Sequence, residues 1–188
     1  LLPELQFDRV LVEASGAEAI GAEITLNRGS SAENLLWWLS YAWSEVEDAT
    51  PDGDIKRSWD QTHTAKGGMS WRWGPWNFSA AGEVHTGWPK TVMTGETVTA
   101  PDGSTDLLLQ VSARNDSRYS VFHGLDVRVS REFDVGRGDL TAFLEITNLY
   151  DRANPCCTEY SLLPDGSLGS RESNWLPLVP SLGAVWRF

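Results

Sequence analysis

The sequence predicts an all-β fold: an antiparallel, up-and-down segment of a transmembrane β-barrel, with about seven long strands that form an incomplete barrel. Three observations lead to this prediction. Apolar and polar residues alternate along much of the chain of 188 residues. Short and long connections between the alternating stretches follow one another strictly. Ten tryptophans are present, and such an aromatic excess is typical of surfaces that lie at an interface.

Seven stretches alternate with period two and end at clusters of Gly, Pro, Asn or Asp. They cover residues 17–28, 35–46, 61–73, 76–88, 118–133, 139–150 and 175–188. Most have 12–16 residues, whereas strands of globular sheets usually have about 5–6. Strands of this length suit a tilted crossing of a bilayer core of about 30 Å.

The lengths of the connections between these strands predict that one end of the sheet carries short turns and the other end carries long loops. The short ones are 29–34, 74–75 and 134–138, and the long ones are 47–60, 89–117 and 151–174. Strict alternation places every short turn at one end and every long loop at the other, as in outer-membrane barrels. The long connections hold thirteen Asp and Glu against six Lys and Arg, so about seven of the eleven net negative charges lie at that end.

Each strand is expected to have one apolar and one polar face. The sixth strand, for example, turns Leu140, Leu144 and Ile146 to one side and Thr141 and Glu145 to the other. In a soluble sandwich the apolar face would form the core. In a membrane barrel it would meet lipid, and the polar face would line the lumen. Face composition alone does not choose between the two.

The expected registers pair opposite charges on the polar face. The two-residue turn between the third and fourth strands places Lys66 directly opposite Glu83. In the next hairpin, pairing of the strand ends places Arg128 opposite Glu145. Opposite charges directly across a strand pair stabilise it by up to ~1 kcal/mol. We expect both pairs to face the lumen.

Aromatic residues of the apolar faces are expected at two levels. Those at the short-turn end are Trp71, Trp73, Trp76, Phe78, Phe133, Trp186 and Phe188, and those at the long-loop end are Trp88, Tyr119, Tyr150 and Trp175. Aliphatic residues lie between the two sets. Two such belts are typical of the two membrane–water interfaces. The alternative is that the rings fill the ends of a sandwich core. The second strand fits less well, because Trp37, Trp38 and Trp43 do not segregate.

Composition excludes several classes of protein. The net charge of −11 argues against nucleic acid as a partner, because phosphate binding needs clustered Lys and Arg. The longest strongly apolar run, residues 35–39, is far shorter than the ~20 residues that a helical span needs. No hydrolase, zinc-protease or phosphate-loop motif occurs. The carboxylates Glu83, Asp126 and Glu145 are spaced as residues of a wall, so we expect neither enzyme activity nor a cofactor.

Cysteine and histidine residues suggest little chemistry. Cys156 and Cys157 are adjacent in the last long connection, where an oxidising compartment would allow a vicinal disulfide. Soft metals also bind thiolates, but no histidine lies nearby in sequence, and we expect no metal site. His63, His85 and His123 are expected to be separate residues of the wall.

Several segments together resemble the late barrel strands of TonB-dependent outer-membrane receptors. They are Arg57-Ser-Trp-Asp-Gln-Thr-His63, Ser70-Trp-Arg-Trp-Gly-Pro-Trp76, His85-Thr-Gly-Trp-Pro89, Thr147-Asn-Leu-Tyr-Asp151, Asn154-Pro-Cys-Cys157 and Pro180-Ser-Leu-Gly-Ala-Val-Trp-Arg-Phe188. The terminal Phe188, preceded by Trp186, Ala184 and Leu182 on alternate positions, is similar to the signal that outer-membrane assembly machinery reads. The resemblance covers nearly the whole chain.

The resemblance implies that residues 1–188 are the C-terminal part of a receptor barrel in the bacterial outer membrane. Transporters of this kind have about 22 strands and a plugged lumen, so about fifteen strands and the plug domain would precede Leu1, as would any signal peptide. Seven strands cannot close, because bacterial single-chain barrels need at least about eight. The implied function is uptake of a scarce nutrient (an iron–siderophore, a cobalamin or an oligosaccharide) driven by the TonB energy-coupling system.

Two other functions stay open at this point. A soluble, secreted β-sandwich that binds carbohydrate would gather Trp71, Trp73, Trp76 and Trp88 into one exposed platform. An outer-membrane barrel enzyme would need a cluster of Ser, His and acidic residues, of which the sequence offers no convincing example, and a simple porin would lack the plug.

Overall fold

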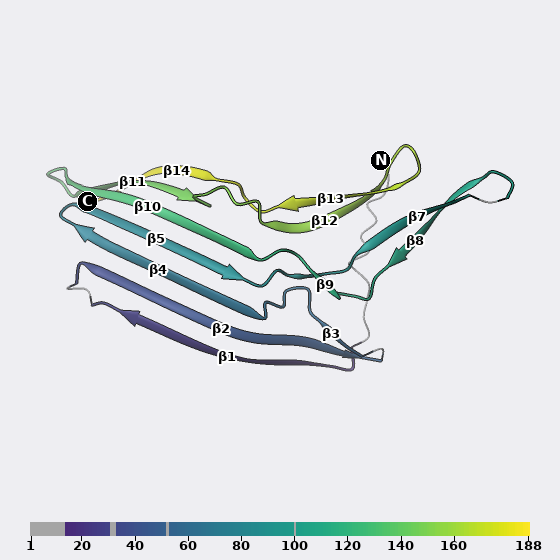
Figure 1. Ribbon diagram of the computed structural model, residues 1–188. Coiled ribbons are helices and arrows are strands. Elements are labelled where there is room, and N and C mark those ends of the chain that lie inside the picture. The colour runs from purple at the N-terminus through teal and green to yellow at the C-terminus, as the bar shows by residue number, and fades with distance from the viewer. Residues whose placement is uncertain (1–13, 31–32, 52, 100) are drawn as a thin grey trace.

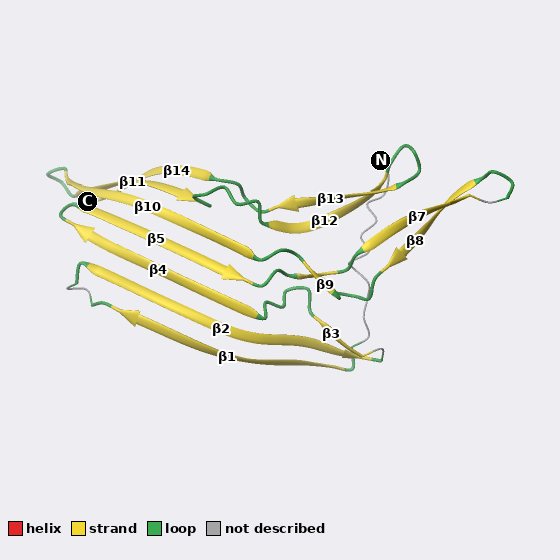
Figure 2. Cartoon of the chain, viewed as in Figure 1, coloured by secondary structure: helices red, strands yellow, loops and turns green. Residues whose placement is uncertain are grey.

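The computed structural model describes residues 14–30, 33–51, 53–99 and 101–188, and their regular structure is β-strand (Figures 1 and 2). The large sheet contains β1 (Gly16–Arg28), β2 (Leu35–Thr50), β3 (Gly53–Lys56), β4 (His63–Trp73), β5 (Trp76–His85), β10 (Phe122–Asp134), β11 (Asp139–Thr147) and β14 (Val179–Arg187). The remaining strands are β6 (Pro89–Lys90), β7 (Met93–Thr99), β8 (Thr105–Val111), β9 (Ser117–Arg118), β12 (Pro155–Leu162) and β13 (Leu168–Asn174).

The large sheet has eight antiparallel strands and is not closed into a barrel. Its order is β1-β2-β4-β5-β10-β11-β14, and β3 pairs with the C-terminal end of β2. It forms a single curved layer, and β7–β8 and β12–β13 extend beyond the end opposite the short turns (Figure 1). Among the described residues, no helix is long and apolar enough to cross a membrane.

The seven strands expected from alternation are the seven strands on the path of this sheet. The first, β1, has 13 residues and agrees with the expected stretch 17–28 to within one residue, whereas β2 has 16 residues and continues four residues beyond the expected stretch 35–46. The registers are also those expected: Lys66 pairs with Glu83, and Arg128 pairs with Glu145. Alternation therefore fixes both the faces and the pairing wherever a strand runs without interruption.

Five expected strand ends are wrong by three or more residues: β2 continues to Thr50, β5 ends at His85, and three further ends differ in the second half of the chain. The stretch 118–133 is broken, because β9 ends at Arg118 and β10 begins only at Phe122. The stretch 139–150 ends at Thr147, because Asn148 adopts a left-handed backbone (φ 52°) that no strand continues. The stretch 175–188 becomes β14 only at Val179, two residues after a proline that lacks the amide for a ladder.

The long connections are β-hairpins rather than irregular loops, which the alternation did not predict. The sequence Pro-Asp-Gly occurs once in each long connection, at residues 51–53, 101–103 and 164–166, and the second and third occurrences lie at the tips of β7–β8 and β12–β13. Such a sequence favours a tight turn, because Pro presets one φ angle and Gly accepts a positive one. In the second occurrence Gly103 has φ 84°, and Asp102 Oδ1 accepts hydrogen bonds from the Ser104 amide (2.9 Å) and hydroxyl (2.7 Å). The third occurrence repeats this geometry around Asp165.

Substitution of the turn glycine is expected to loosen its hairpin. A Cβ at Gly103 would meet no neighbouring atom, so the effect of Gly103→Ala is purely that of an L-residue held at positive φ. That strain costs about 1 kcal/mol, and amides of β7 and β8 should exchange about fivefold faster with deuterium. Gly16→Ala is the control, because Gly16 has open space and no positive φ. If the β7 and β8 amides exchanged equally fast in the Gly103→Ala and Gly16→Ala proteins, the role of Gly103 as a turn residue at positive φ would be contradicted.

The sheet has no hydrophobic core. Among the described residues, Met93 is the only buried hydrophobic side chain. The apolar face is open instead: Ile24 on β1 is 60% exposed, Met69 on β4 is 49% exposed, and Leu182 on β14 is 84% exposed. A sheet this size with an uncovered apolar face needs something apolar against it.

Candidate functional site

The polar face of the sheet carries the two expected ion pairs. Lys66 Nζ lies 3.4 Å from Glu83 Oε2, and Arg128 Nη1 lies 3.2 Å from Glu145 Oε2. The Arg128 guanidinium also lies over the ring of Phe143, 3.8 Å from its centroid. All four charged side chains are 38–49% exposed, so the pairs add little stability and leave charge available to a ligand or a covering domain. That this face lines a lumen stays a prediction.

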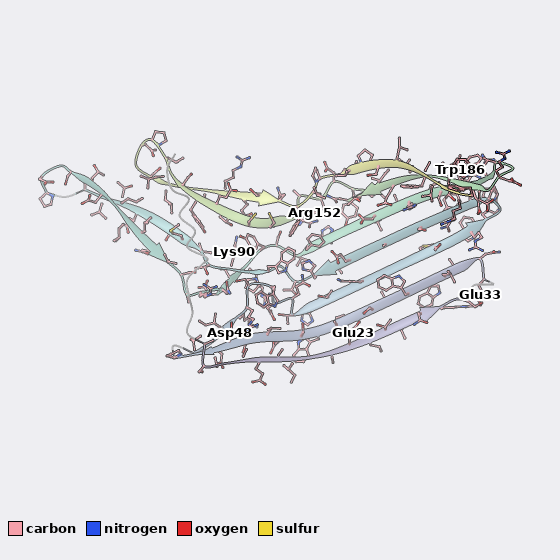
Figure 3. All side chains as sticks on the ribbon, turned by 180° about the vertical axis from the view of Figure 1, so that it is seen from behind. Glu23, Glu33, Asp48, Lys90, Arg152 and Trp186 are labelled. Carbon is pink, nitrogen blue, oxygen red and sulfur yellow. The ribbon has the colours of Figure 1, made fainter. Side chains whose placement is uncertain are left out.

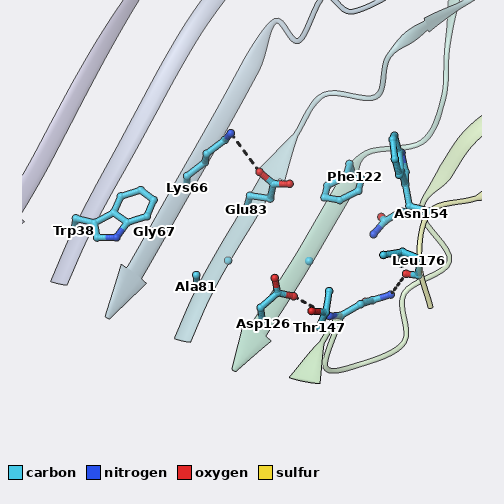
Figure 4. Close-up of a pocket in the computed structure, with 14 residues that line it drawn as sticks. Trp38, Lys66, Gly67, Ala81, Glu83, Phe122, Asp126, Thr147, Asn154 and Leu176 are labelled. Carbon is cyan, nitrogen blue, oxygen red and sulfur yellow. Dashed lines mark hydrogen bonds and ion pairs between the residues drawn. The ribbon is translucent and has the colours of Figure 1, made fainter. Parts of the chain in front are cut away.

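A hollow of about 420 Å³ lies on this face, toward the long-loop end (Figure 4). Lys66, Glu83 and Asp126 contribute its charges. The indole of Trp38 forms one side and covers Gly68, where an added Cβ would lie only 2.6 Å from the indole nitrogen. A larger residue at position 68 would displace this ring, and the register, which pairs Trp38 with Gly68, places Trp38 on the polar face and not with the apolar-face tryptophans.

Two buried asparagines hold the hollow's rim. Asn148 Nδ2 donates to the carbonyls of Arg152 (3.0 Å) and Leu176 (3.1 Å), and its own amide donates to Asp126 (2.8 Å). Asn154 is only 3% exposed, and its side chain bonds both backbone groups of one β10 residue, the amide (3.2 Å) and the carbonyl (2.9 Å) of His123. Both asparagines belong to the motifs 147–151 and 154–157, whose role here is to fasten two connections to the sheet.

Aromatic rings of the apolar face form a row at the short-turn end. Trp71 stacks on Phe78 with centroids 5.6 Å apart, and Trp186 lies 5.3 Å from Phe188. Figure 3 places Trp186 at this end and Asp48 and Lys90 at the other. Further ring contacts join Trp71 to Trp73 and Trp76 to Phe78.

An arginine joins this row, which the sequence did not reveal as special. Arg131 pairs with Trp76 and so lies on the apolar face. Its guanidinium lies 5.1 Å from the Trp76 ring centroid and 4.8 Å from that of Phe133. A cation lying on aromatic rings at the edge of an apolar surface is typical of a side chain that reaches for water.

At the long-loop end, all four aromatic residues expected on the apolar face lie outside the strands of the large sheet. Trp88 does not continue the apolar face, because β5 ends at His85 and the alternation ends with it. Its ring packs on His85 (4.7 Å) and on Trp175 (5.8 Å), over the polar side. Tyr119 likewise lies outside β10, where its hydroxyl bonds Thr158 Oγ1 at 3.0 Å. Trp88, Tyr119 and Trp175 thus lie outside the strands that form the apolar face, and their place at a membrane interface stays a prediction.

Tyrosine–histidine pairs occupy the apolar face at that end instead. The Tyr150 hydroxyl lies 2.8 Å from His123 Nδ1, and the Tyr41 hydroxyl lies 2.9 Å from His63 Nδ1. Both histidines fall on the apolar face by register. Each pair combines an apolar body with a polar tip, as expected of residues at the margin of an apolar band.

Within the described part of the chain, no group of three or more His, Cys, Asp or Glu side chains could hold a metal ion.

A buried ion pair ties two long connections together. Asp60 is 1% exposed, and its carboxylate accepts hydrogen bonds from the Arg118 guanidinium, the Val46 amide (3.0 Å) and the Thr62 hydroxyl (3.1 Å). Burial alone would raise the pKa of Asp60, but the hydrogen bonds from Arg118, Val46 and Thr62 hold that pKa below its ordinary value. Arg118 also donates to the carbonyl of Gly87 (2.9 Å).

A second hollow, of about 320 Å³, lies among the connections. Five of its fifteen lining residues are aromatic, and its charged lining residue, Lys90, forms an ion pair with Glu172 at 2.7 Å. The rings that line it are Trp59, Trp88, Tyr119, Tyr160 and Trp175. Cys156 and Cys157 line the same hollow. The sequence offered no signal for it, because its residues come from three connections.

The two cysteines are free in this structure, so the vicinal disulfide stays a prediction. Hydrogen bonding with Cys156, with a smaller contribution from burial, raises the pKa of Cys157 to about 11. Because the thiolate is the nucleophile, alkylation of Cys157 by iodoacetamide is expected to be slow at pH 7 and to accelerate about tenfold per pH unit up to pH 11. Replacement of its neighbour in Cys156→Ser should shift this rise to lower pH. If the alkylation rate reached a plateau near pH 9 in both the wild type and Cys156→Ser, the raised pKa of Cys157 would be contradicted.

Comparison with known proteins adds no family: no family model, curated protein or solved structure matches this chain.

Proposed function

We propose that this chain is the C-terminal wall of a TonB-dependent outer-membrane receptor that imports a scarce nutrient. In this proposal the apolar face meets lipid, and the polar face meets a plug domain carried by another part of the receptor. The hairpins at the long-loop end lie outside the cell. Energy comes from the TonB system, so the chain itself needs no catalytic residue.

The observation that carries the proposal is the exposed apolar face of a single-layer sheet. Leu182 is 84% exposed and Ile24 is 60% exposed, on strands at opposite edges of the sheet. Burial of such a face stabilises a protein by about 25 cal/mol per Å², and lipid can provide that burial across the whole sheet. Strands at both edges, β1 and β14, also have unpaired backbone groups that further strands of a barrel would satisfy.

The row of rings at the short-turn end gives separate support. Trp71, Trp73, Trp76 and Phe78 lie next to one another, Arg131 lies over the Trp76 ring, and aliphatic residues follow along the same face. Aromatic and basic residues favour the level of lipid headgroups.

A secreted carbohydrate-binding sandwich is less well supported. It needs a second layer over the apolar face, and in the part of the chain described here that face is open. It also expects Trp88 beside Trp71, whereas Trp88 packs on His85 over the other face.

Sequencing of the coding DNA upstream of Leu1 in its natural source tests the proposal. The expected result is an open frame that encodes about fifteen further alternating strands, a compact plug-sized domain and a signal peptide. A start codon immediately before Leu1 would overturn the proposal, because an open eight-stranded sheet has two edges that lipid cannot satisfy.

A further inference from the structure

The two cysteines lie at an irregularity of the β12–β13 hairpin. Pro155 pairs with Asn174 and Cys157 pairs with Ser173, so Cys156 is an extra residue in β12. Side chains of neighbouring strand residues normally point to opposite faces. A bulge sets two residues against one partner and re-aims a side chain. It accounts for the fact that adjacent cysteines line the same hollow.

Both cysteines line this hollow, and neither residue is buried. Cys157 is exposed, and Cys156 is half-buried with its thiol donating to the Ser173 carbonyl at 3.3 Å. The thiols also interact with each other, which is the largest cause of the raised pKa of Cys157. Two neighbouring thiols at the open wall of a hollow form a chelating pair, since one electrophilic centre can bond to both.

We propose that Cys156 and Cys157 form a dithiol site with two exclusive states: reduced, it binds one thiophilic centre such as arsenic(III) across both sulfurs, and oxidised, it is closed as a vicinal disulfide. The Cys156 thiol gives up its hydrogen bond to Ser173 in either case, so the hairpin beside Trp175 is altered by both events. This site goes beyond the proposed function and does not depend on it.

The bonds in each state balance. With oxidised glutathione, one cysteine sulfur attacks the glutathione disulfide and releases one glutathione thiol. The second cysteine sulfur then displaces the other glutathione, so the disulfide of the oxidant is reduced and that of the protein is formed. With phenylarsine oxide, two As–S bonds form, the As–O bond breaks, and the oxygen leaves as water with the two thiol protons.

The experiment treats the complete natural protein with phenylarsine oxide and then with iodoacetamide. Trypsin releases residues 153–171, which contain both cysteines and no internal Lys or Arg, so mass spectrometry reads this site alone. Wild type is expected to carry one phenylarsenic group and no alkyl group. The single variants Cys156→Ser and Cys157→Ser are expected to carry one alkyl group and no arsenic, which shows that each remaining thiol is accessible.

Prior treatment with oxidised glutathione tests the closed state. The expected peptide is lighter by two hydrogen atoms, carries no arsenic, and binds arsenic again after reduction with dithiothreitol. Two alkyl groups on wild type after phenylarsine oxide would overturn the proposal, because the thiols would then be accessible but unable to converge. A stable mixed disulfide with glutathione on either cysteine would overturn the closed state.

Discussion

Val129→Arg is expected to destabilise the protein in a lipid bilayer, by less than the about 2–4 kcal/mol of an arginine at the bilayer midplane because Val129 lies next to the aromatic row, whereas Ser130→Arg changes its stability little. Val129 lies on the apolar face between Phe78 and Leu144 of the adjacent strands. The arginine would have to leave water for hydrocarbon at this position. Its neighbour Ser130 points to the polar face, next to Asn77. Unfolding by urea from lipid vesicles measures both free energies.

The two variants differ by one position in the same strand, so the introduced side chain lies at nearly the same depth in both. In cells, Val129→Arg should lower the amount of folded protein in the outer membrane, and Ser130→Arg should leave it near the wild-type amount. Equal losses for the two variants would contradict the assignment of faces, and a larger loss for Ser130→Arg would reverse it.

Removal of the cation from the buried pair should have a still larger effect. Arg118→Met is expected to lower the free energy of unfolding of the connections by about 3–5 kcal/mol, because it leaves the buried Asp60 carboxylate without its cation. Asp60→Asn in the same background should recover part of the loss, since the buried charge is then gone. Arg57→Met is the matched control: its partner Asp48 is 2.6 Å away, but both side chains are partly exposed, so a much smaller loss of stability is expected.

The same pair predicts a pH dependence. The pKa of Asp60 is lower in the folded protein than its ordinary value of 3.8. The pair therefore stabilises the fold fully above that ordinary value, and the contribution is lost as the pH falls through the lower, folded-state pKa. Hydrogen exchange of the Val46 amide, which donates to Asp60, should report this loss below about pH 4. An Arg118→Met protein that loses protection over the same pH range by the same amount would contradict the explanation.

The sequence predicts the sheet well because the period of a strand is two and the hairpin turns are short. Lys66 reaches Glu83 for that reason alone. The prediction fails where a strand ends: beyond His85 the alternation no longer fixes the direction of a side chain, and Trp88 turns to the polar side. The hairpins of the long connections were predictable from their three Pro-Asp-Gly sequences, which carry a specific turn chemistry.

Contacts among the connections were not predictable, because they join residues far apart in sequence. Asp60 and Arg118 are separated by 58 positions, and nothing in either local sequence indicates the other. The second hollow has the same origin. The adjacency of Cys156 and Cys157 is evident from the sequence, but the bulge that turns both toward one hollow is not.

The most direct test of the central claim is a nitroxide scan along β11 of the complete protein in lipid vesicles. Collisions with oxygen, which concentrates in lipid, and with a water-soluble nickel chelate are measured at each position. If the apolar face meets lipid, oxygen collision rates are high at Leu140, Ala142, Leu144 and Ile146, and nickel collision rates are high at the alternate positions. A soluble sandwich core would shield the four residues from both reagents, and that result would contradict the account.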